Sequence, residues 1–395
     1  MRILSLNSGS SSLKLALYYI GHDERLMLSG SIRGIGLNKS LFHIEDWDSK
    51  ILVDQRIHLS EWETSITTLL EWLRNHDYMK DLDAVGHRIV HGGTEYNEPH
   101  LVTSKLMKTL TKLVPFVPDH LPQELKVINV IGKNYKALKQ VVCFDTSFHR
   151  NMPRLAQIYA LPRFLSSEGV IRYGFHGLSY EYILDKLRRD AGNEVAEGRI
   201  IIAHLGSGTS MVAVRDGESV DTTMGFTPTG GLMMSTRSGD LDPGVILYLL
   251  KEKELSSSAV GEMVNRQAGL LGVSGVSSDM KELLEKEVEN PDAAEAVGLF
   301  CYQAKKFLGA LAAILGGVDT LVFTGGIGEN GVLIRERICK DMEFLGICLD
   351  SDRNNNNASI ISRVDSPVTV RVIKTNEELM IARHTNKCII KMKKS

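Results

Sequence analysis

The chain has 395 residues, of which 43% are hydrophobic and 24% are charged, and its formal net charge is −2. This composition is typical of a folded protein with more than one domain, and it gives no sign of a nucleic-acid or membrane partner. Five cysteines lie far apart with no Cys-x-x-Cys pair, which argues against a zinc site or a disulfide framework. The most apolar helix-like segment, Phe307–Val318, is shorter than the roughly 20 residues of a bilayer span, so a cytoplasmic protein is expected.

The beginning of the chain predicts a β-hairpin with a serine-rich tip. An apolar strand over Ile3–Leu6 is followed by the tip Asn7-Ser8-Gly9-Ser10-Ser11-Ser12 and by a second strand over Leu13–Tyr18. Serines are poor turn residues unless something accepts their hydrogen bonds, and Lys14 adds a positive charge, so this tip is a candidate phosphate site. Short strands and turns are expected next, and then an amphipathic helix over Glu61–Asn75.

The next feature is an arginine inside an apolar strand, in the sequence AVGHRIV over residues 84–90. Arg88 is either a surface residue, as arginine usually is, or a buried guanidinium, which is costly without a partner. Its apolar neighbours favour burial, and a bound carboxylate or phosphate would satisfy it with two hydrogen bonds. Further on, helices are expected over Lys105–Val114 and Gln123–Gly132, and three prolines between them stiffen a loop around His120.

Two candidate ligand-binding residues follow. Asp145 comes directly after a buried-type strand over Val141–Phe144, and ligands of open α/β sheets gather at the carboxyl ends of strands. The alternative is that Asp145 caps a helix or turn. His176 lies between Gly174 and Gly177, where a histidine is either a packed side chain or part of a loop shaped for function.

The stretch Arg199–Val214, with the sequence RIIIAHLGSGTSMVAV, predicts a second hairpin of the same design. A helix over Tyr180–Arg189 and a polar break precede it, so one lobe is expected to end here. For one hairpin alone, an ordinary turn with a polar tip is the alternative. Two such hairpins predict duplicated α/β lobes that offer their tips to one phosphate. The hydroxyls of Ser207, Thr209 and Ser210 are candidate ligands.

The C-terminal half adds a second arginine and a glycine turn. Arg237 stands in a glycine-rich segment, and two arginines are what an enzyme needs to neutralise a transferring phosphoryl group. A helix over Ala293–Leu315 leads to a buried strand and to Gly325–Asn330, where the change from strand to glycine turn to helix favours nucleotide contact. Asn354–Asn357 is expected to be a surface turn. Glu377 and its neighbour begin the last helix, where they serve the helix dipole or hold magnesium.

Taken together, the glycine, arginine and histidine motifs are, in order, NSGSSSLK, VGHRIVHGG, FDTSFHRNMP, YGFHG, HLGSGTS, MGFTP, TRSGDLDPG, FTGGIGEN and TNEELMIAR. This set, in this order and over nearly the whole chain, resembles the acetate/propionate kinase family of the actin-like and sugar-kinase superfamily. The resemblance implies an α/β fold of two duplicated actin-like (ribonuclease H-like) lobes, with mixed sheets flanked by helices and a cleft between the lobes. The expected domains are a first lobe over 1–195 with the acyl-substrate residues and a second lobe over 196–375 with the nucleotide. Two alternatives are kept: the last helix of 1–195 packs either on its own lobe or on the other one, and the terminal helix and basic tail over 376–395 either return to the first lobe or do not.

The resemblance also implies an activity and its partners. The expected reaction is reversible, ATP-dependent phosphorylation of acetate to acetyl phosphate by direct in-line transfer, with Mg²⁺ or Mn²⁺, in a cytoplasmic homodimer that binds neither nucleic acid nor membrane. A carboxylate is already a nucleophile at neutral pH, so alignment and charge neutralisation suffice.

Particular residues receive roles from the same resemblance. Arg88 and Arg237 would grip the carboxylate and the phosphoryl group, His176 would donate a hydrogen bond to the latter, and Asp145 would orient the acyl group or help position the metal. The substrate-binding residues would be Arg88, Val90, His120, Phe175 and Pro228, and the metal residues Asn7 and Glu377. The nucleotide-binding residues would be Lys14, Ser10, Ser12, His204, Leu205, Gly206, Ser207, Gly208, Asp279, Met280, Lys281, Gly326, Ile327, Gly328, Glu329 and Asn330.

The chain departs from the family pattern near the expected site. Ser207 stands where the family usually has asparagine, Asp119 stands where leucine is usual before His120, and Tyr180 replaces a histidine. These departures keep two alternatives open: a propionate or other short-chain carboxylate kinase, and a degenerate paralogue that acts as a nucleotide-binding regulator. A nucleotide-driven clamp is a third alternative, because the same two-lobed fold serves such proteins.

Overall fold

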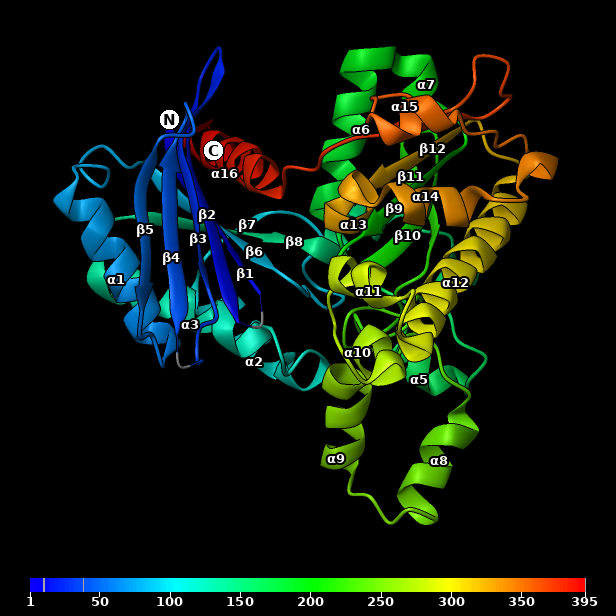
Figure 1. Cartoon of the computed structure of the whole chain (residues 1–395). Helices are drawn as coiled ribbons and strands as arrows, with labels where there is room; N and C mark the ends of the chain where they lie inside the picture. The colour runs from blue at the N-terminus through cyan, green and yellow to red at the C-terminus, as the bar shows by residue number, and fades with distance from the viewer. Residues whose placement is uncertain (10, 38, 395) are drawn as a thin grey trace. The chain divides into compact units, whose positions relative to one another are not determined.

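The computed structural model describes residues 1–9, 11–37 and 39–394. The chain divides into two compact units (Figure 1). Unit 1 consists of Met1–Ser147, Gly177–Ser179 and Asn376–Ser395, and unit 2 consists of Phe148–His176 and Tyr180–Thr375. The terminal helix therefore groups with unit 1. Residues 148–176 and 180–195, which the sequence assigns to the first lobe, group with unit 2.

Unit 1 is built on an eight-stranded sheet with the order β5-β4-β3-β2-β1-β6-β8-β7. Its strands are β1 (Arg2–Ser8), β2 (Ser12–Ile20), β3 (Glu24–Arg33), β4 (Ser40–Asp46), β5 (Ile51–Ile57), β6 (Ala84–Ile89), β7 (His100–Leu101) and β8 (Lys139–Phe144). Its helices are α1 (Trp62–Asn75), α2 (Ser104–Lys112), α3 (Leu121–Asn134) and α16 (Glu377–Lys394), with a 3-10 turn η1 (Val114–Phe116).

Both faces of this sheet are covered. Alternate residues of a strand point to opposite faces. Leu4 and Leu6 of β1 accordingly pack with α1 and α3, whereas Ile3 packs with Ala382 of α16. Gly86 on β6 allows α16 to approach closely, because a Cβ there would clash with Thr385 Oγ1. The close approach of α16 holds the last motif of the sequence beside the first strand.

Unit 2 is built on a five-stranded sheet with the order β11-β10-β9-β12-β13. Its strands are β9 (Ile200–Leu205), β10 (Thr209–Arg215), β11 (Glu218–Thr222), β12 (Thr320–Thr324) and β13 (Thr369–Val372). Its helices are α4 (Arg154–Gln157), α5 (Arg163–Ser167), α6 (Gly177–Ala191), α7 (Asn193–Glu197), α8 (Pro243–Lys251), α9 (Ser257–Glu262), α10 (Gly269–Ser274), α11 (Met280–Lys286), α12 (Pro291–Leu315), α13 (Gly325–Asn330), α14 (Val332–Cys339) and α15 (Ser351–Asn355). Short turns are η2 (Asp145–His149), which joins the units, η3 (Met263–Gln267) and η4 (Glu343–Leu345).

Helices also cover both faces of the second sheet. Ile201 and Ala203 of β9 pack in the cluster that contains α12, whereas Ile200 and Ile202 pack with α6. This packing is the physical reason why α6 belongs to unit 2 from Tyr180 onward, whereas its first residues Gly177–Ser179 group with unit 1. The helix α12 has 25 residues, long and apolar enough by length and composition to cross a membrane. The predicted helix over Ala293–Leu315 is confirmed, and the structure places it in the core of unit 2. The expectation that the most apolar helical segment is too short to span a bilayer was wrong.

The two sheets repeat one topology. In unit 1, β1, β2 and β3 form an antiparallel meander, and β6 and β8 continue the sheet in parallel on the other side of β1. In unit 2, β9, β10 and β11 form the same meander, and β12 and β13 continue in parallel beside β9. Both predicted hairpins are confirmed, as is the duplication that they indicated.

Candidate active site

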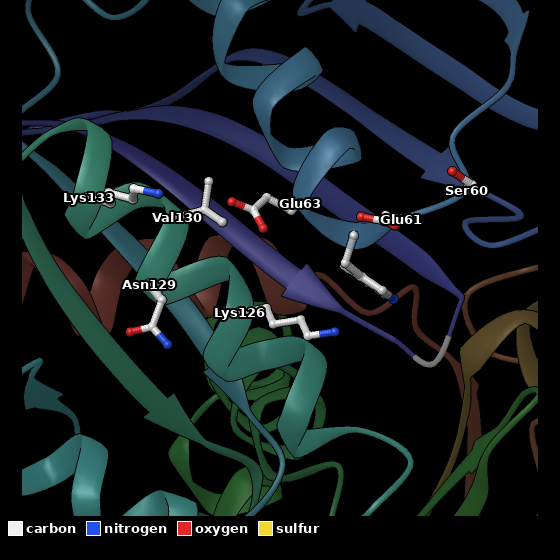
Figure 2. Close-up of a pocket in the computed structure, with 8 residues that line it drawn as sticks. Ser60, Glu61, Glu63, Lys126, Asn129, Val130 and Lys133 are labelled. Carbon is white, nitrogen blue, oxygen red and sulfur yellow. The ribbon is translucent and has the colours of Figure 1, made fainter.

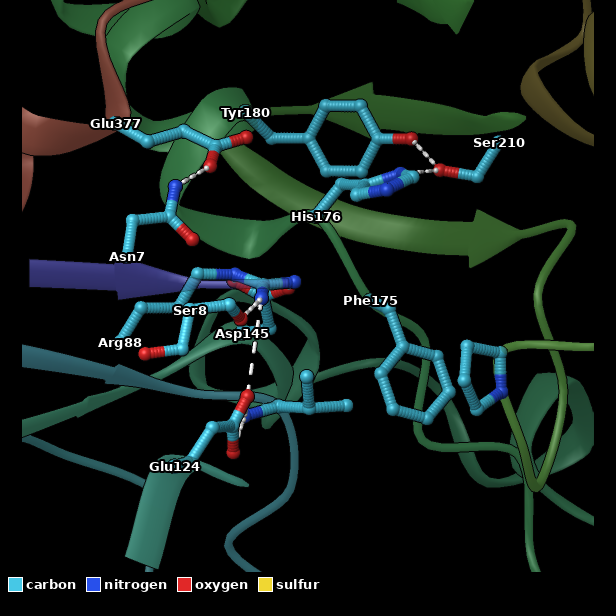
Figure 3. Close-up of polar contacts among 12 residues, drawn as sticks. Asn7, Ser8, Arg88, Glu124, Asp145, Phe175, His176, Tyr180, Ser210 and Glu377 are labelled. Atoms are coloured by element: carbon cyan, nitrogen blue, oxygen red, sulfur yellow. Dashed lines mark hydrogen bonds and ion pairs between the residues drawn. The ribbon is translucent and has the colours of Figure 1, made fainter. Parts of the chain in front are cut away.

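In unit 1, polar residues gather at the carboxyl ends of the parallel strands β1, β6 and β8. Asn7 and Ser8 end β1, Arg88 lies one residue before the end of β6, and Asp145 directly follows β8. Because parallel strands end at the same edge of a sheet, these residues come together, as the position of Asp145 after its strand predicted. Figure 3 shows the ion pairs that Arg88 forms with Asp145 and with Glu124.

Arg88 is held by carboxylates of its own chain. Its Nε donates to Asp145 Oδ1 at 3.1 Å and its Nη2 to Asp145 Oδ2 at 2.5 Å, and its Nη1 lies 3.8 Å from Glu124 Oε1. Burial alone would lower the pKa of Arg88, but the carboxylates of Asp145, Glu377 and Glu124 outweigh it and hold the pKa above the ordinary value. The bidentate partner expected to be a bound anion is thus a protein side chain. The guanidinium is fixed before any substrate arrives.

Glu124 is a fully buried carboxyl group that sequence reasoning missed. Both of its oxygens accept from the backbone N–H of Val90, at 3.3 and 3.1 Å. Burial raises its pKa to about 8, although Arg88 and the Val90 N–H act in the opposite direction. Glu124 occupies a position of α3 that apolar residues hold elsewhere along the same helix face. A charged residue in the apolar stripe of a helix was the available signal.

A second acidic group lies beside Asn7. The Nδ2 of Asn7 donates to Glu377 Oε2 at 2.8 Å and to Glu378 Oε1 at 3.2 Å. The pKa of Glu378 is raised by burial and by the charge of Glu377, against the lowering effect of Lys14. Two adjacent carboxylates at one amide fit a divalent cation, which would relieve their repulsion. No group of three or more histidine, cysteine, aspartate or glutamate side chains that could hold a metal is present in the described part of the chain.

In unit 2, the loop that carries His176 has a strained but well-supported backbone. His176 adopts φ +60°, which is unusual for a residue with a side chain, and Gly174 before it has φ +73°. A Cβ at Gly174 would lie 2.6 Å from the ring of His149. His149 is buried, its Nε2 lies 3.1 Å from the Phe175 carbonyl oxygen, and burial lowers its pKa to about 4. The loop is therefore shaped, as the flanking glycines indicated.

His176, Arg237 and the tip of the second hairpin come together in unit 2. A side chain at Gly208 would place its Cβ 3.2 Å from His176 Nε2 and 3.7 Å from Arg237 Nη2. The ring of His176 stacks on that of His204, with 4.2 Å between centroids and 23° between planes. Arg237 donates to the Pro228 carbonyl oxygen at 2.7 Å. The side chains of His176 and Arg237, which can both donate hydrogen bonds, therefore lie beside the hairpin bend at Gly208.

The two glycine turns of unit 2 also lie side by side. A Cβ at Gly206 would lie 3.8 Å from the Gly326 backbone nitrogen, and Gly325, with φ +76°, faces the Leu205 carbonyl. Glu329 fixes this arrangement, because its Oε1 accepts from the N–H groups of Gly325 and Thr375 at 3.0 and 3.1 Å. Backbone N–H groups at a helix start beside a hairpin bend suit phosphate oxygens.

Other predicted residues have different environments. Among the hairpin hydroxyls, Ser207 is exposed, but Thr209 and Ser210 are buried and bonded inside the protein, so the expectation for these two was wrong. Asp279 caps α11 by accepting from Lys281 N–H at 2.9 Å. In the first hairpin, Ser12 is half-buried and Lys14 is exposed, and Ser10 lies outside the described residues.

The remaining predicted residues differ in burial. Val90 and Phe175 are each 1% exposed, whereas His120 and Pro228 are half-buried. Met280 belongs to the core of unit 2, Lys281 is exposed, and Asn330 donates from its side chain to the Gly326 carbonyl at 2.9 Å. Ile327 packs against the core of unit 2, and Gly328 is buried.

Further residues support these clusters. Ser210, expected to be a phosphate ligand, and Tyr180, singled out only as a departure from the family pattern, form a hydrogen-bonded group with His176. Arg335 and its contacts were missed by sequence reasoning. Arg335 is fully buried, and its Nη1 donates to the carbonyl oxygens of Gly328 and Glu329 at 2.9 and 3.0 Å. Its Nε donates to Asn354 Oδ1 at 2.9 Å. Asn354 is 2% exposed, so the surface turn expected there was wrong at this residue.

Two pockets in unit 1 lie apart from the predicted residues. One, of about 520 Å³, is lined by residues of α1 and α3, including Glu63, Asn129 and Lys133 (Figure 2). The other, of about 1040 Å³, includes Tyr19 and Trp47. None of the described residues predicted for the site lines either pocket. The candidate site therefore rests on the polar clusters.

Two duplicated α/β units, one with polar side chains and the other with glycine turns at the carboxyl ends of parallel strands, fit an actin-like phosphotransferase. The profile of the Acetokinase family matches residues 2–383. The chain is 44% identical to an acetate kinase of Rhodopseudomonas palustris over 389 residues, which cover 97% of each chain. The crystal structure of Porphyromonas gingivalis acetate kinase superimposes with a TM-score of 0.87 at 38% identity, covering 98% of this chain and 99% of that one. The crystal structure of a propionate kinase from Francisella tularensis superimposes with a TM-score of 0.91 at 33% identity, and it too covers 98% of this chain and 99% of that one.

The chain belongs to the Acetokinase family, and its fold is the actin-like fold of these kinases. The family resemblance and the fold class predicted from the motifs are confirmed.

Proposed function

We propose that the chain transfers the γ-phosphoryl group of ATP to acetate, reversibly, giving acetyl phosphate and ADP. Membership of the Acetokinase family and relatives named acetate kinase at 44% identity support the reaction. The observation that carries the proposal is the convergence of His176, Arg237 and Gly208 in unit 2, because it concentrates donors and positive charge where a phosphoryl group would need them.

The chemistry asks little of the protein beyond alignment. A carboxylate oxygen of acetate attacks the γ-phosphorus, a new O–P bond forms, and the bond to the ADP oxygen breaks, with no proton to remove from the nucleophile. Arg88 binds the acetate carboxylate or the phosphoryl oxygens, and Arg237 and His176 bind the phosphoryl group during its transfer. Asp145 holds Arg88 in place. Hairpin residues His204, Gly206 and Gly208 and the turn Gly326–Asn330 receive the nucleotide.

Asn7 and Glu377, with Glu378, are the residues that fit Mg²⁺. Their oxygen atoms are hard donors, and Mg²⁺ keeps much of its water shell, so few protein ligands suffice. When bound, the ion neutralises charge on the nucleotide phosphates. The protein's own part is to hold the two carboxylates together through the Asn7 amide.

The experiment is a hydroxamate assay with ATP and Mg²⁺ across acetate, propionate and butyrate. We expect acyl hydroxamate with the highest kcat/KM for acetate. The substitutions Arg88→Ala and Arg237→Ala should each lower kcat/KM by about 10³-fold or more, because each removes a charge that the transition state needs. Unchanged turnover in both variants would refute their assigned roles, and no hydroxamate from any acid would refute the activity.

A preference for propionate is the second candidate, and the propionate kinase with a TM-score of 0.91 favours it. The same assay decides it through the ratio of kcat/KM for the two acids. A paralogue that only binds nucleotide would bind ATP in calorimetry and give no acyl phosphate with any acid.

We also propose a homodimer in the cytoplasm, with neither nucleic acid nor membrane as a partner. An apolar surface on α8 supports the dimer, since Val245, Leu247 and Tyr248 are 42%, 52% and 50% exposed. Light scattering of the purified protein measures the mass directly. A monomer at micromolar concentration would overturn the dimer.

A further inference from the structure

Two hydrogen bonds link Tyr180 to His176 through Ser210. His176 Nδ1 lies 2.8 Å from Ser210 Oγ, and the Tyr180 hydroxyl forms a short hydrogen bond to the same oxygen (Figure 3). Tyr180 and Ser210 are both fully buried. His176 precedes α6 and Tyr180 lies in its first turn, where its N–H donates to the His176 carbonyl oxygen at 3.1 Å. The three side chains thus form one rigid group inside unit 2.

The chemistry of the three groups decides which way the protons point. Ser210 has one hydroxyl proton and two acceptor lone pairs, so it can donate to one of these partners and accept from the other, or accept from both. Because Ser210 is fully buried, the first arrangement is favoured: it gives the hydroxyl proton an acceptor, whereas accepting from both would direct that proton to neither of these partners. A phenol is a better donor than an aliphatic hydroxyl, and an unprotonated imidazole nitrogen is a better acceptor than a phenol oxygen. The favoured order therefore runs from Tyr180 to Ser210 and from Ser210 to His176 Nδ1.

This order determines the tautomer of the imidazole. When Nδ1 accepts from Ser210, the neutral ring carries its proton on Nε2. That nitrogen is the one that faces the hairpin bend, since a Cβ at Gly208 would lie 3.2 Å from it. Stacking on His204 fixes the plane of the ring. The Nε2–H group therefore lies at the hairpin bend beside Gly208, which the Arg237 guanidinium also approaches.

We propose that Tyr180 and Ser210 are positioning residues that hold His176 in its Nε2–H tautomer, so that this nitrogen donates a hydrogen bond to an oxygen of the transferring phosphoryl group. The part that concerns the phosphoryl group rests on the proposed function. In the opposite tautomer a lone pair would face the anionic oxygen and repel it. The relay makes the donor permanent and requires no proton uptake from solvent.

The test is a long-range ¹H–¹⁵N correlation spectrum of the full chain labelled in its histidines, at about pH 8, where a histidine of ordinary pKa near 6.5 is neutral. The signals of His176 are assigned by their loss in His176→Gln. We expect a protonated Nε2 and an unprotonated Nδ1 in the unsubstituted protein. In Tyr180→Phe and Ser210→Ala we expect a mixture of tautomers or the opposite one.

Kinetics supply the second measurement. Tyr180→Phe should lower kcat roughly 3- to 10-fold and Ser210→Ala roughly 10- to 100-fold, with KM for ATP and acetate within about twofold, since the lost bond acts in the transition state. Tyr182→Phe is the matched control: it removes the hydroxyl of a half-buried tyrosine that lies in the same helix and packs against the same apolar cluster. It should change neither the spectrum nor kcat.

The outcomes separate this inference from the proposed function. An unprotonated Nε2 in the unsubstituted protein, or the same single tautomer in both variants, would overturn the relay whether or not the protein is a kinase. The expected tautomers in a protein without kinase activity would support the relay and refute the reaction. If Tyr180→Phe fails to fold, the unsubstituted spectrum and Ser210→Ala still decide.

Discussion

Arg88 and Asp145 form a bidentate ion pair inside unit 1, with 3.1 Å from Nε to Oδ1 and 2.5 Å from Nη2 to Oδ2. The Asp145 side chain is 1% exposed and that of Arg88 is 13% exposed, so water screens the pair little. Glu124 approaches the same guanidinium from α3. Arg88 therefore points in a direction that its own protein sets, and a substrate anion would meet a positioned group.

The first prediction concerns this pair. Asp145→Asn keeps the shape of the side chain but removes its charge, so Arg88 loses its firmest anchor. We expect kcat/KM to fall by about 10²-fold or more and the free energy of unfolding to fall by about 3–5 kcal/mol, as for a buried pair that loses one partner. Steady-state kinetics and urea denaturation measure the two effects.

A matched control exists on the surface of unit 2. Arg199 and Asp319 form a pair of the same geometry, at 3.1 and 2.5 Å, but their side chains are 42% and 46% exposed. Asp319→Asn should leave kinetics unchanged and stability nearly so, because solvent already screens this pair. Equal effects of the two substitutions would show that burial at Asp145 has no special role.

The second prediction concerns the bend of the second hairpin. Gly208→Ala would place a methyl group 3.2 Å from His176 Nε2 and 3.7 Å from Arg237 Nη2. The two side chains must shift by a few tenths of an ångström, and phosphoryl transfer depends on their alignment. We expect kcat to fall roughly 10- to 100-fold while the melting temperature stays within a few degrees.

Gly298→Ala is the control for this change. Gly298 lies in α12, where an added methyl group would meet no heavy atom within 4 Å beyond its own helix backbone and chain neighbours. Alanine should therefore leave kcat unchanged and raise helix stability by up to about 1 kcal/mol. Full activity in Gly208→Ala would contradict the convergence of His176 and Arg237 on this bend.

Local sequence patterns predicted much of the fold because each acts within a few residues. The 3.6-residue period of α1 and the helix end at Gly316 after α12 follow from side-chain pattern and backbone freedom. Both hairpins follow from apolar runs that flank glycine and serine. The position of Asp145 after β8 could be predicted from the strand pattern alone, and residues at the carboxyl ends of strands are candidates for ligand binding in α/β sheets.

Contacts between distant segments were not predictable in the same way. The partner of Arg88 lies 57 residues away, and the partner of His176 lies 34 residues away. Asn354 resembled a surface residue because it stands in a polar run, yet it is buried and accepts a hydrogen bond from the buried Arg335. A single sequence records which groups are polar, but only the fold decides which of them meet.

The third prediction concerns the pH dependence of stability. Burial raises the pKa of Glu124 from 4.5 to about 8, so the folded protein binds this proton more tightly than the unfolded chain. Stability from this source is fully present below pH 4.5 and is lost as the pH rises toward 8. Relative to Glu124→Gln, the unsubstituted protein should therefore lose stability across this window. Urea denaturation at about pH 5, 6, 7 and 8 measures the difference.

Glu71→Gln is the control, because Glu71 is an exposed residue of α1. The free energy of unfolding of this variant should differ from that of the unsubstituted protein by the same amount at every pH. A constant difference between Glu124→Gln and the unsubstituted protein across the whole range would show that Glu124 is already ionised at the acidic end.

The last prediction concerns Arg335, which ties the glycine turn of unit 2 to α15. Its guanidinium donates to Gly328 and Glu329 carbonyl oxygens on one side and to Asn354 and Asn357 on the other, with 2.6 Å to Asn357 Oδ1. Asn354→Ala removes an acceptor from a buried cation, so we expect a loss of about 1.5–3 kcal/mol in the free energy of unfolding. The turn would loosen, and KM for ATP should rise roughly 3- to 10-fold with a smaller change in KM for acetate.

Asn356→Ala provides the comparison within the same polar run. Asn356 is exposed, and its amide donates to the Asp352 carbonyl oxygen at 2.9 Å, away from Arg335. Stability should change by less than about 0.5 kcal/mol and KM for ATP by less than twofold, as is usual for surface positions. If Asn354→Ala raises both KM values equally, the loss reflects general loosening of unit 2. A selective rise for ATP assigns the Arg335 network to the nucleotide turn.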